Sequence, residues 1–307
     1  MNALQDLLRS IDFTKTRIER QPAFLAVFGG ELSKDEKGEP KSQRDEFVKD
    51  IRNNHPDLKD RLLVPESYED WNDFDTYSDL LQFERDLGYI TGAVIIFLEA
   101  PGSIAELGAF SQIDSLRENL IVVVPESRHP KKSFISLGPL RQLQNADSRS
   151  VCVVPNHNNK RLNEDIFVVL EHVNSRFEKE PEKQRLKEKF RRHEIILTLD
   201  LISLAEVITM TELHSALQVF NLEATQRSVQ QSLFTLTKTG LVSSRTYGGT
   251  TYYHPMLPAK TWADYDACEG AENFQRARWQ ARIRKELHGN QKLKRVWELH
   301  HGKELFA

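Results

Sequence analysis

The chain has 307 residues, 39% of them hydrophobic and 28% charged, which is typical of a globular protein with more than one domain. Its two cysteines, Cys152 and Cys268, are far apart and show no metal-ligand spacing, so neither a disulfide framework nor a zinc site is expected. No apolar run approaches the roughly 20 residues that span a bilayer, and no signal peptide is evident. We therefore expect a cytoplasmic protein with no membrane contact, no metal and no bound cofactor.

The formal net charge of −3 conceals two halves of opposite sign. Residues 1–176 contain 22 Lys and Arg against 29 Asp and Glu, whereas residues 177–307 contain 20 against 16. A positive surface attracts polyanions. The C-terminal half is therefore the better candidate for binding nucleic acid.

In residues 1–176, short apolar runs rich in Val and Ile alternate with segments of helical periodicity. The predicted strands are residues 23–30, 61–65, 93–98, 120–125 and 150–155, and the helical patterns lie between them. Continuous apolar strands are typical of a parallel sheet that is covered on both faces, with its ligands beyond the carboxyl ends of the strands. The first domain is therefore predicted to be α/β.

Residues 177–194 are almost wholly charged and are predicted to form a solvated connecting helix. Three helical patterns and a two-part strand pattern that turns at Gly248-Gly249 then follow in residues 195–258, which is the order of a winged helix-turn-helix. Residues 259–307 are predicted to be a basic helical tail. The predicted fold class is thus a parallel-sheet α/β domain followed by a mostly helical winged-helix domain.

One carboxylate stands out, Glu106, in the sequence "AVIIFLEAPGSIAELGAF" of residues 93–110. Ser103 and Glu106 match the S-x-x-E capping box, which offers a purely structural explanation. The same glutamate follows a buried strand, however, and so lies where a parallel sheet binds ligands. There, a carboxylate near a helix start is held in its charged form by the helix dipole, and it could attack an anomeric carbon.

The order of these motifs resembles the nucleoside deoxyribosyltransferase fold, whose ELG-containing helix start supplies the nucleophilic glutamate. Glu106 of "AELGAF" matches that residue. With the winged-helix pattern, the whole chain resembles the ribosyltransferase/DNA-binding effectors of bacterial type II retrons, which are antiphage defence systems. The resemblance implies two partners, a reverse transcriptase and its msDNA, that hold the effector inactive. It also leads us to expect an oligomer or higher-order assembly.

The sequence departs from the deoxyribosyltransferase pattern at one acidic position. An aspartate usually lies about six residues before the glutamate, but Ala100 stands there, next to Glu99. Asp79 falls near the place of another family acid, although a solvated helix residue is the plainer explanation. Nicotinamide leaves NAD⁺ from a ring that is already cationic, so one carboxylate suffices. NAD⁺ is therefore the expected substrate, ahead of nucleosides and nucleotides, whose bases benefit from protonation.

Phe28, Gly29 and Gly30 end the first predicted strand and form a second candidate substrate-binding segment, together with Ser103. Glycines after a strand let backbone amides approach a phosphate or ribose. A tight turn without a ligand is the plainer explanation of the two glycines.

The nucleic-acid candidates lie in the C-terminal half. Arg227, Gln230 and Lys238 can face outward from a recognition helix, and Arg245 can reach the backbone from the hairpin. Arg278 and Arg282 belong to the basic tail, where a packed helix with a solvated surface is the plainer explanation. A winged helix can also dock proteins.

Two other functions remain open. The chain could be a nucleotide-responsive DNA-binding regulator without catalysis, for which Glu106 would be dispensable. It could also transfer ADP-ribose to a macromolecule instead of to water.

Overall fold

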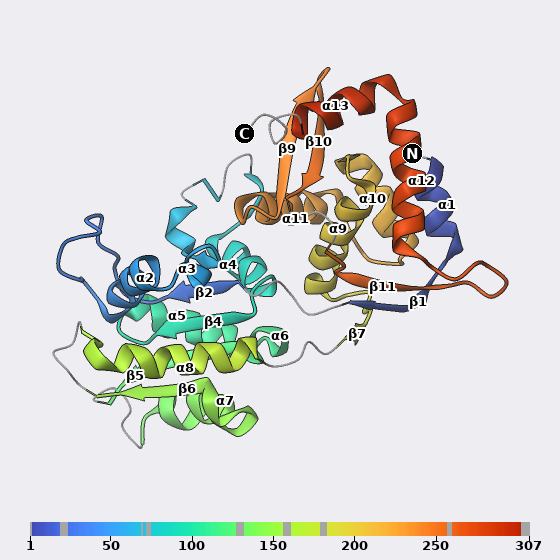
Figure 1. Cartoon of the computed structure of the whole chain (residues 1–307). Helices are drawn as coiled ribbons and strands as arrows, with labels where there is room; N and C mark the ends of the chain where they lie inside the picture. Colours follow the sequence, from blue (N-terminus) through green and yellow to red (C-terminus); the bar gives the residue numbers. More distant parts are fainter. Residues whose placement is uncertain are drawn as a thin grey trace. The chain divides into compact units, whose positions relative to one another are not determined.

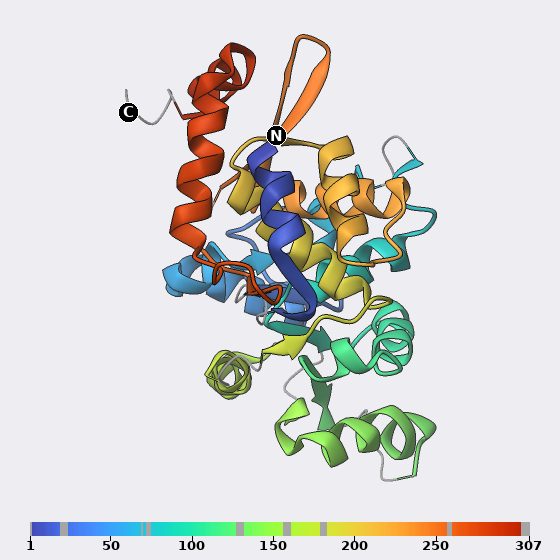
Figure 2. The same cartoon turned by 90° about the vertical axis from the view of Figure 1, so that its right-hand side faces the viewer.

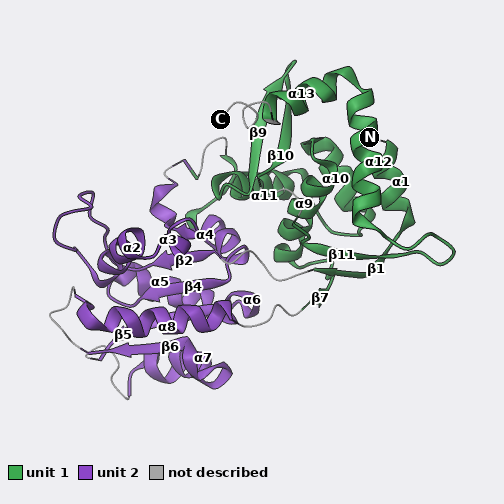
Figure 3. Cartoon of the chain, in the orientation of Figure 1, with its two compact units in different colours: residues 1–20, 71–80, 181–307 green, residues 21–70, 81–180 purple. Residues whose placement is uncertain are grey.

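The computed structural model describes residues 2–18, 24–68, 70–71, 75–126, 132–155, 161–178, 183–256 and 260–301. The chain divides into two compact units, coloured separately in Figure 3. We call residues 21–70 and 81–180 the sheet unit, and residues 1–20, 71–80 and 181–307 the helical unit.

The sheet unit is built on a parallel five-stranded sheet, as the apolar runs predicted (Figure 1). Its strands lie in the order β3, β2, β4, β5, β6, and every neighbouring pair is parallel. The strands are β2 (Leu25–Phe28), β3 (Leu62–Leu63), β4 (Ala93–Phe97), β5 (Leu120–Pro125) and β6 (Val151–Val154).

The strand order fixes where a ligand can bind. After β2 the chain forms β3 at one edge, and it then crosses to the other side of β2 to form β4. The connections thus leave β2 and β4 in opposite directions, and a crevice opens at the carboxyl ends of such strands. Segments that follow β2 and β4 therefore line the predicted crevice.

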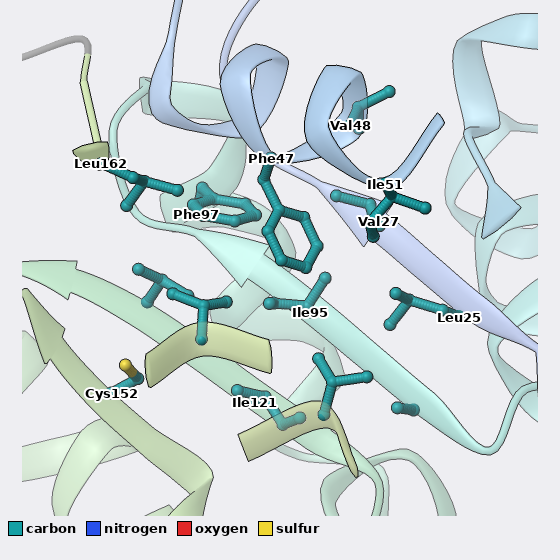
Figure 4. Packing of buried hydrophobic residues seen from close by; sticks show 14 of the residues in the cluster. Leu25, Val27, Phe47, Val48, Ile51, Ile95, Phe97, Ile121, Cys152 and Leu162 are labelled. Carbon is teal, nitrogen blue, oxygen red and sulfur yellow. The ribbon is translucent and has the colours of Figure 1, made fainter. Parts of the chain in front are cut away.

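Helices cover both faces of the sheet. One face packs Phe47 and Ile51 of α2 (Gln43–Asn54) against Val27, Ile95 and neighbouring apolar side chains (Figure 4). Alternate strand residues point to the other face, where the ring of Phe28 meets the ring of Phe110 edge to face. The other helical elements are α3 (Pro56–Lys59), η1 (Pro65–Ser67), α4 (Leu80–Tyr89), α5 (Pro101–Phe110), α6 (Asp114–Arg117), η4 (Ser136–Leu140), α7 (Arg141–Ala146), η5 (Ser148–Ser150), η6 (Asn163–Asp165) and α8 (Ile166–Phe177).

The first residues of the chain belong to the helical unit, not to the sheet unit as the predicted 1–176 domain implied. Strand β1 (Ile11–Ile18) pairs antiparallel with β11 (Ala263–Ala267) and with β7 (Gln184–Arg185). Helix α1 (Asn2–Ser10) packs on α12 (Arg276–Gly289), and α12 in turn packs on α9 (Arg191–Ala205) (Figure 2). Main-chain pairing between the two ends of the sequence therefore sets this boundary.

The predicted connecting helix over residues 177–194 is not continuous. Helix α8 ends at Phe177, β7 occupies Gln184–Arg185, and α9 begins only at Arg191. Gln184 and Arg185 are held as a strand by Ile18 and Arg17 of β1. Here tertiary pairing overrides the helical preference of a charged run.

In the helical unit, α9 is followed by α10 (Met210–Val219), α11 (Gln226–Lys238) and a hairpin of β9 (Val242–Tyr247) and β10 (Thr250–Pro255). The hairpin turns at Gly248 and Gly249, both with positive φ, a conformation that glycine adopts without strain. A short strand, β8 (Ile208–Thr209), pairs with β10, and α13 (Gln291–His301) follows α12.

Asp200 of α9 ties this unit together. Its carboxylate is fully buried and accepts hydrogen bonds from the Trp262 and Ala263 amides, from the Tyr265 hydroxyl and from the Arg276 guanidinium. A buried charge is tolerated because it is paired and fully hydrogen-bonded.

Candidate active site

Glu106 lies in the second turn of α5, directly beyond β4. The helix starts three residues earlier than a capping box of Ser103 and Glu106 requires, with Ala100 as N-cap and Pro101 at the first helical position, where proline is preorganised. Ser103 therefore occupies the third helical position, and its hydroxyl donates to the Ala100 carbonyl and accepts from the Ala100 amide. Glu106 is thus not the capping glutamate of Ser103.

The Glu106 carboxyl is a partly buried acid with one oxygen left over. Within the described residues, Oε2 is buried and has no hydrogen-bond partner. Burial raises the pKa of Glu106 to about 7, and the Glu66 charge adds to the rise while the Arg44 charge opposes it. The expectation that the helix dipole keeps this group charged is therefore wrong, since the dipole acts mainly within the first turn and burial outweighs it.

Arg44 is the positive charge of the site. Its guanidinium, only 1% exposed, donates to both carboxylate oxygens of Glu66 at 2.5 and 2.6 Å. It also donates to the carbonyls of Val27 and Gly30, at the carboxyl end of β2. The buried guanidinium of Arg44 is thus held by two backbone carbonyls and by a bidentate ion pair with the Glu66 carboxylate. Glu66 follows β3, so the pair joins α2 to the segment after β3.

Glu84 of α4 is a further buried carboxyl in the same group of charges. Burial raises the pKa of Glu84 to about 8, and the charges of Glu106 and Glu66 raise it further, while Arg44 lowers it. Burial also works against ionisation of Glu66, but the hydrogen bonds and charge of Arg44 outweigh it, so the pKa of Glu66 is lowered. Around one arginine, Glu66 is therefore ionised, Glu106 titrates near neutrality and Glu84 stays protonated.

In the predicted substrate-binding segment at Gly29 and Gly30, the Gly30 amide is bonded to the protein itself. The Glu99 carboxylate accepts from the Gly30 amide at 3.1 Å and from the Gln43 and Arg44 amides at 2.9 and 3.0 Å. It thus fills the positive N-terminus of α2. Glu99, the acid beside Ala100, therefore anchors α2 to the strand that leads into α5.

Close packing explains both glycines. A Cβ on Gly29 would lie 2.8 Å from Cβ of Phe97, and one on Gly30 would lie 2.7 Å from Cβ of Ser42. Phe28 and Ser103 are also buried, so the Phe28 ring and the Ser103 hydroxyl serve packing and the α5 start.

Asp79 belongs to the helical unit, where its carboxylate accepts from the Ser78 hydroxyl at 2.9 Å. Its catalytic role stays a prediction. Within the sheet unit, the Glu66 charge raises the pKa of Glu106, and the Glu106 charge raises the pKa of Glu84.

Such a group of charges suits chemistry at a sugar carbon. Two carboxyls whose environments separate their pKa values divide into an ionised nucleophile and a protonated acid. No cluster of three or more His, Cys, Asp or Glu side chains able to hold a metal ion occurs in the described part of the chain. Cys152 is buried, and burial together with the Asp165 charge raises the pKa of its thiol to about 12, so it is no nucleophile at neutral pH.

Comparison with known proteins places this site in a family context. Residues 40–244, more than half of the chain, match the family described as STM3845 retron effector protein. The chain belongs to this retron effector family. The match includes Arg44, Glu66, Glu84 and Glu106, and it extends through α11 into β9.

Two relatives from Escherichia coli are similar to this retron effector over shorter stretches. Both are named as putative ribosyltransferase/DNA-binding proteins, one of retron Ec86 and one of retron Ec73. The first is 43% identical over 72 residues, 24% of each chain, and the second is 33% identical over 118 residues, 37% of this chain and 36% of the relative. The matched stretches thus span well under half of either relative.

Three of the predicted nucleic-acid residues lie on α11 of the effector. Arg227 is exposed and donates to the carbonyl of Asp75 at 3.4 Å. Gln230 is exposed, and Lys238 is half-buried with its ammonium group 5.2 Å from the centre of the Phe234 ring. Gln230 and Lys238 both line a cavity of about 280 Å³.

The other three lie on the hairpin and on α12. Arg245 donates to the carbonyl of Leu299 of α13. Arg278 pairs with Glu272 at 2.6 Å, and the Arg282 guanidinium stacks over the Trp279 ring at 4.3 Å. Arg278 and Arg282 remain exposed. The described part of the effector contains no helix long and apolar enough to cross a membrane.

Sequence reasoning missed Arg44, Glu66 and Glu84. Arg44 and Glu84 lie on helical patterns among many charged residues, and Glu66 lies in a short turn after β3. A buried charge is visible in sequence only as a charged residue on the apolar stripe of a helix. Glu84 follows the buried Phe83 and precedes the buried Leu87 in α4, which was the one available signal.

Proposed function

We propose that the sheet unit of this retron effector cleaves an N-glycosidic bond, with Glu106 as the nucleophile. The observation that carries the proposal is Oε2 of Glu106, which is buried and has no hydrogen-bond partner within the described residues. It belongs to the helix directly after β4, where a sheet of this strand order is expected to bind ligands. The family is that of retron effectors, and two relatives carry ribosyltransferase in their names, which supports chemistry at a ribose carbon. The specific sheet-unit fold proposed is that of the nucleoside deoxyribosyltransferases.

NAD⁺ is the preferred substrate in this proposal. The Glu106 carboxylate forms a bond to C1′ of the ribose while the bond from C1′ to the nicotinamide nitrogen breaks. Nicotinamide leaves with the electron pair and becomes neutral, so it needs no proton. Water then attacks C1′, releases a proton and restores the carboxylate. The products are nicotinamide and ADP-ribose.

Nucleosides and nucleotides form the second substrate class, and Glu84 favours them. A neutral base leaves more readily when its nitrogen is protonated. Glu84 is protonated at neutral pH because burial raises its pKa to about 8. The expectation of NAD⁺ depends partly on Ala100, which stands where the family usually has an acid. Glu84 is an acid from another helix that could supply the missing proton.

The helical unit is proposed to be a winged-helix nucleic-acid or protein docking module. We propose that the effector works in the cytoplasm in an oligomer with a retron reverse transcriptase and msDNA. An enzyme that destroys a metabolite must be restrained, so these partners would hold it inactive until infection. Expression of the chain with and without the partners tests this, since equal toxicity in both cases contradicts restraint.

The deciding experiment measures free nicotinamide after incubation of the purified chain with NAD⁺, with and without its partners. Glu106→Gln should lower the rate on the order of 10³-fold or more, because it removes the nucleophile. Glu118→Gln, an exposed glutamate at the end of α6, is the matched control. Catalysis would be contradicted if no preparation released nicotinamide and the Glu106→Gln variant behaved like wild type in cells.

The same variants test the alternatives. A nucleotide-responsive regulator without catalysis would keep its output in Glu106→Gln and lose it when Arg227 or Lys238 is replaced. If ADP-ribose were transferred to a macromolecule, nicotinamide would still be released, but the amount of free ADP-ribose would be smaller than that of nicotinamide. Mass analysis of both products separates transfer from hydrolysis.

A further inference from the structure

A short segment of the chain is docked on α11. The Tyr77 hydroxyl donates to the carbonyl of Gln231 at 3.1 Å and lies 2.6 Å from the Thr235 hydroxyl. The Gln231 side-chain amide donates to the carbonyl of Thr76 at 2.9 Å. Arg227 reaches the carbonyl of Asp75 in the same way. We call residues 75–77 the α11 strap, and all these contacts lie within the helical unit.

The strap is built as an interior contact. Tyr77 is 1% exposed and Thr76 is 3% exposed. The Tyr77 ring also meets the Phe234 ring, with centroids 6.0 Å apart and planes at 70°. A buried aromatic ring whose hydroxyl finds acceptors gains both apolar burial and polar satisfaction.

The contacts run along one side of α11. Arg227, Gln231 and Phe234 are spaced by four and three residues, so they share a helix face, and all three contact the strap. A recognition helix needs such a face free to enter a major groove, which is only about 12 Å wide. The strap covers part of this face, at the half-buried Gln231 and Phe234, so the face is not free to enter a groove.

Exposed cations occur on the neighbouring helices instead. Those of α12 and α13 are Arg278, Arg282, Arg284, Lys285, Lys292, Lys294 and Arg295, of which Arg284 is paired with Glu206. Residues 278, 282 and 285 share one face of α12 by their spacing. Within the described residues, no carboxylate forms an ion pair with Arg282, Lys285 or Lys292. Glu272 pairs with Arg278, and Glu298 lies 3.9 and 3.7 Å from Lys294 and Arg295.

The β9–β10 hairpin adjoins this set of cations. Lys292 holds its ammonium group 5.6 Å from the centre of the Tyr252 ring of β10. Its Cε lies 3.8 Å from the position a Cβ would take on Gly248, at the hairpin turn. Phosphate contacts need only exposed cations and backbone donors, without a free helix face for base reading.

We infer that the face of α11 marked by Arg227, Gln231 and Phe234 is an intramolecular docking site for the strap, and that a nucleic-acid phosphate backbone binds the exposed cations of α12 and α13 beside the hairpin. The inference concerns the helical unit alone, so it does not depend on glycosidase activity.

Fluorescence anisotropy of the full-length chain with labelled 20-mer DNA, in single-stranded and duplex form, tests the surface. Arg282→Ala/Lys285→Ala/Lys292→Ala should weaken binding at least about tenfold, and it should reduce the salt slope by as much as about three. Arg227→Ala/Gln230→Ala on α11 should stay within about twofold of wild type, since phosphate affinity comes from other cations. Lys34→Ala/Lys37→Ala/Lys59→Ala removes the same charge from the sheet unit and should also have little effect.

The inference is overturned if the Arg227→Ala/Gln230→Ala variant loses DNA affinity tenfold and the triple variant does not. Failure of the wild-type chain to bind either DNA at low salt overturns it too. Circular dichroism checks the fold of each variant. If the triple variant misfolds, Lys285→Ala alone replaces it and should give a smaller loss of DNA affinity. Tyr77→Phe should lower the melting temperature and Tyr77→Ala should lower it more. An unchanged melting temperature in Tyr77→Ala refutes the docked strap.

Discussion

Arg44 and Glu66 form a two-bond ion pair, and the same arginine is the positive charge that acts on Glu106. The pair joins α2 to the turn after β3, while Glu106 comes from the helix after β4. One guanidinium thus pairs with the segment after β3, and its charge acts on the helix after β4. Burial is the largest influence on the ionisation of the proposed nucleophile, and charges 40 and 62 positions away in the sequence modify it.

The pH dependence of cleavage should report the two raised carboxyls. Glu106 must be ionised to attack, so the rate with NAD⁺ should rise with pH through about 7 and then level off. With a purine nucleoside, the rate should also fall above about 8, where Glu84 loses its proton. Initial rates between pH 5 and 9.5 with both substrates check this. A flat profile with NAD⁺ across pH 6 to 8 would rule out the assigned state of Glu106.

Glu66→Gln should move the rising limb of the NAD⁺ profile to lower pH. The Glu66 charge raises the pKa of Glu106 and Arg44 lowers it, so removal of Glu66 takes away the first effect and leaves Arg44 less neutralised. Glu31→Gln, at an exposed position paired with Lys41, should leave the limb unchanged. A shift to higher pH in Glu66→Gln would contradict the electrostatic account.

Glu84→Gln should stabilise the protein more at high pH than at low pH. The folded pKa of Glu84, about 8, lies above its ordinary value of 4.5. The native state therefore binds more protons than the unfolded state between these values, and the free energy of unfolding falls as the pH rises through this window. Melting temperatures of wild type and variant should nearly agree at pH 5 and differ at pH 9. Glu118→Gln provides the control, and an equal difference at both pH values would exclude burial of the charge as the cause.

Two glycine substitutions should have opposite effects on stability. Gly30→Ala places a methyl group 2.7 Å from Cβ of Ser42, so we expect it to destabilise by about 1–3 kcal/mol through overpacking. At Gly108, inside α5, a Cβ meets no atom within 4 Å. Gly108→Ala should therefore stabilise by about 0.5–1 kcal/mol, since alanine favours helix. Urea unfolding of both variants measures the two changes, and a neutral Gly30→Ala would mean that the turn relaxes.

Local signals in the sequence were sufficient for the sheet. The runs at residues 93–98 and 120–125 are apolar throughout because parallel strands are covered on both faces, and both form buried strands. Glu106 could also be singled out in the sequence, because it lies in the helix that directly follows such a strand. The Gly248-Gly249 turn was also readable, since few residues other than glycine accept two successive positive φ angles.

What only the tertiary structure decided depends on residues that are distant along the chain. The pairing of β1 with β11 brings residues 11–18 beside residues 263–267, and no periodicity within either segment encodes that partner. Arg44, Glu66 and Glu84 look like ordinary surface charges until the sheet crossings bring their charges within reach of one another, with Arg44 and Glu84 buried and Glu66 exposed. Tyr77 likewise becomes a core residue only when α11 covers it. A sequence determines periodicity and turns locally, whereas charge environment and partner choice arise from burial, which is a property of the folded chain as a whole.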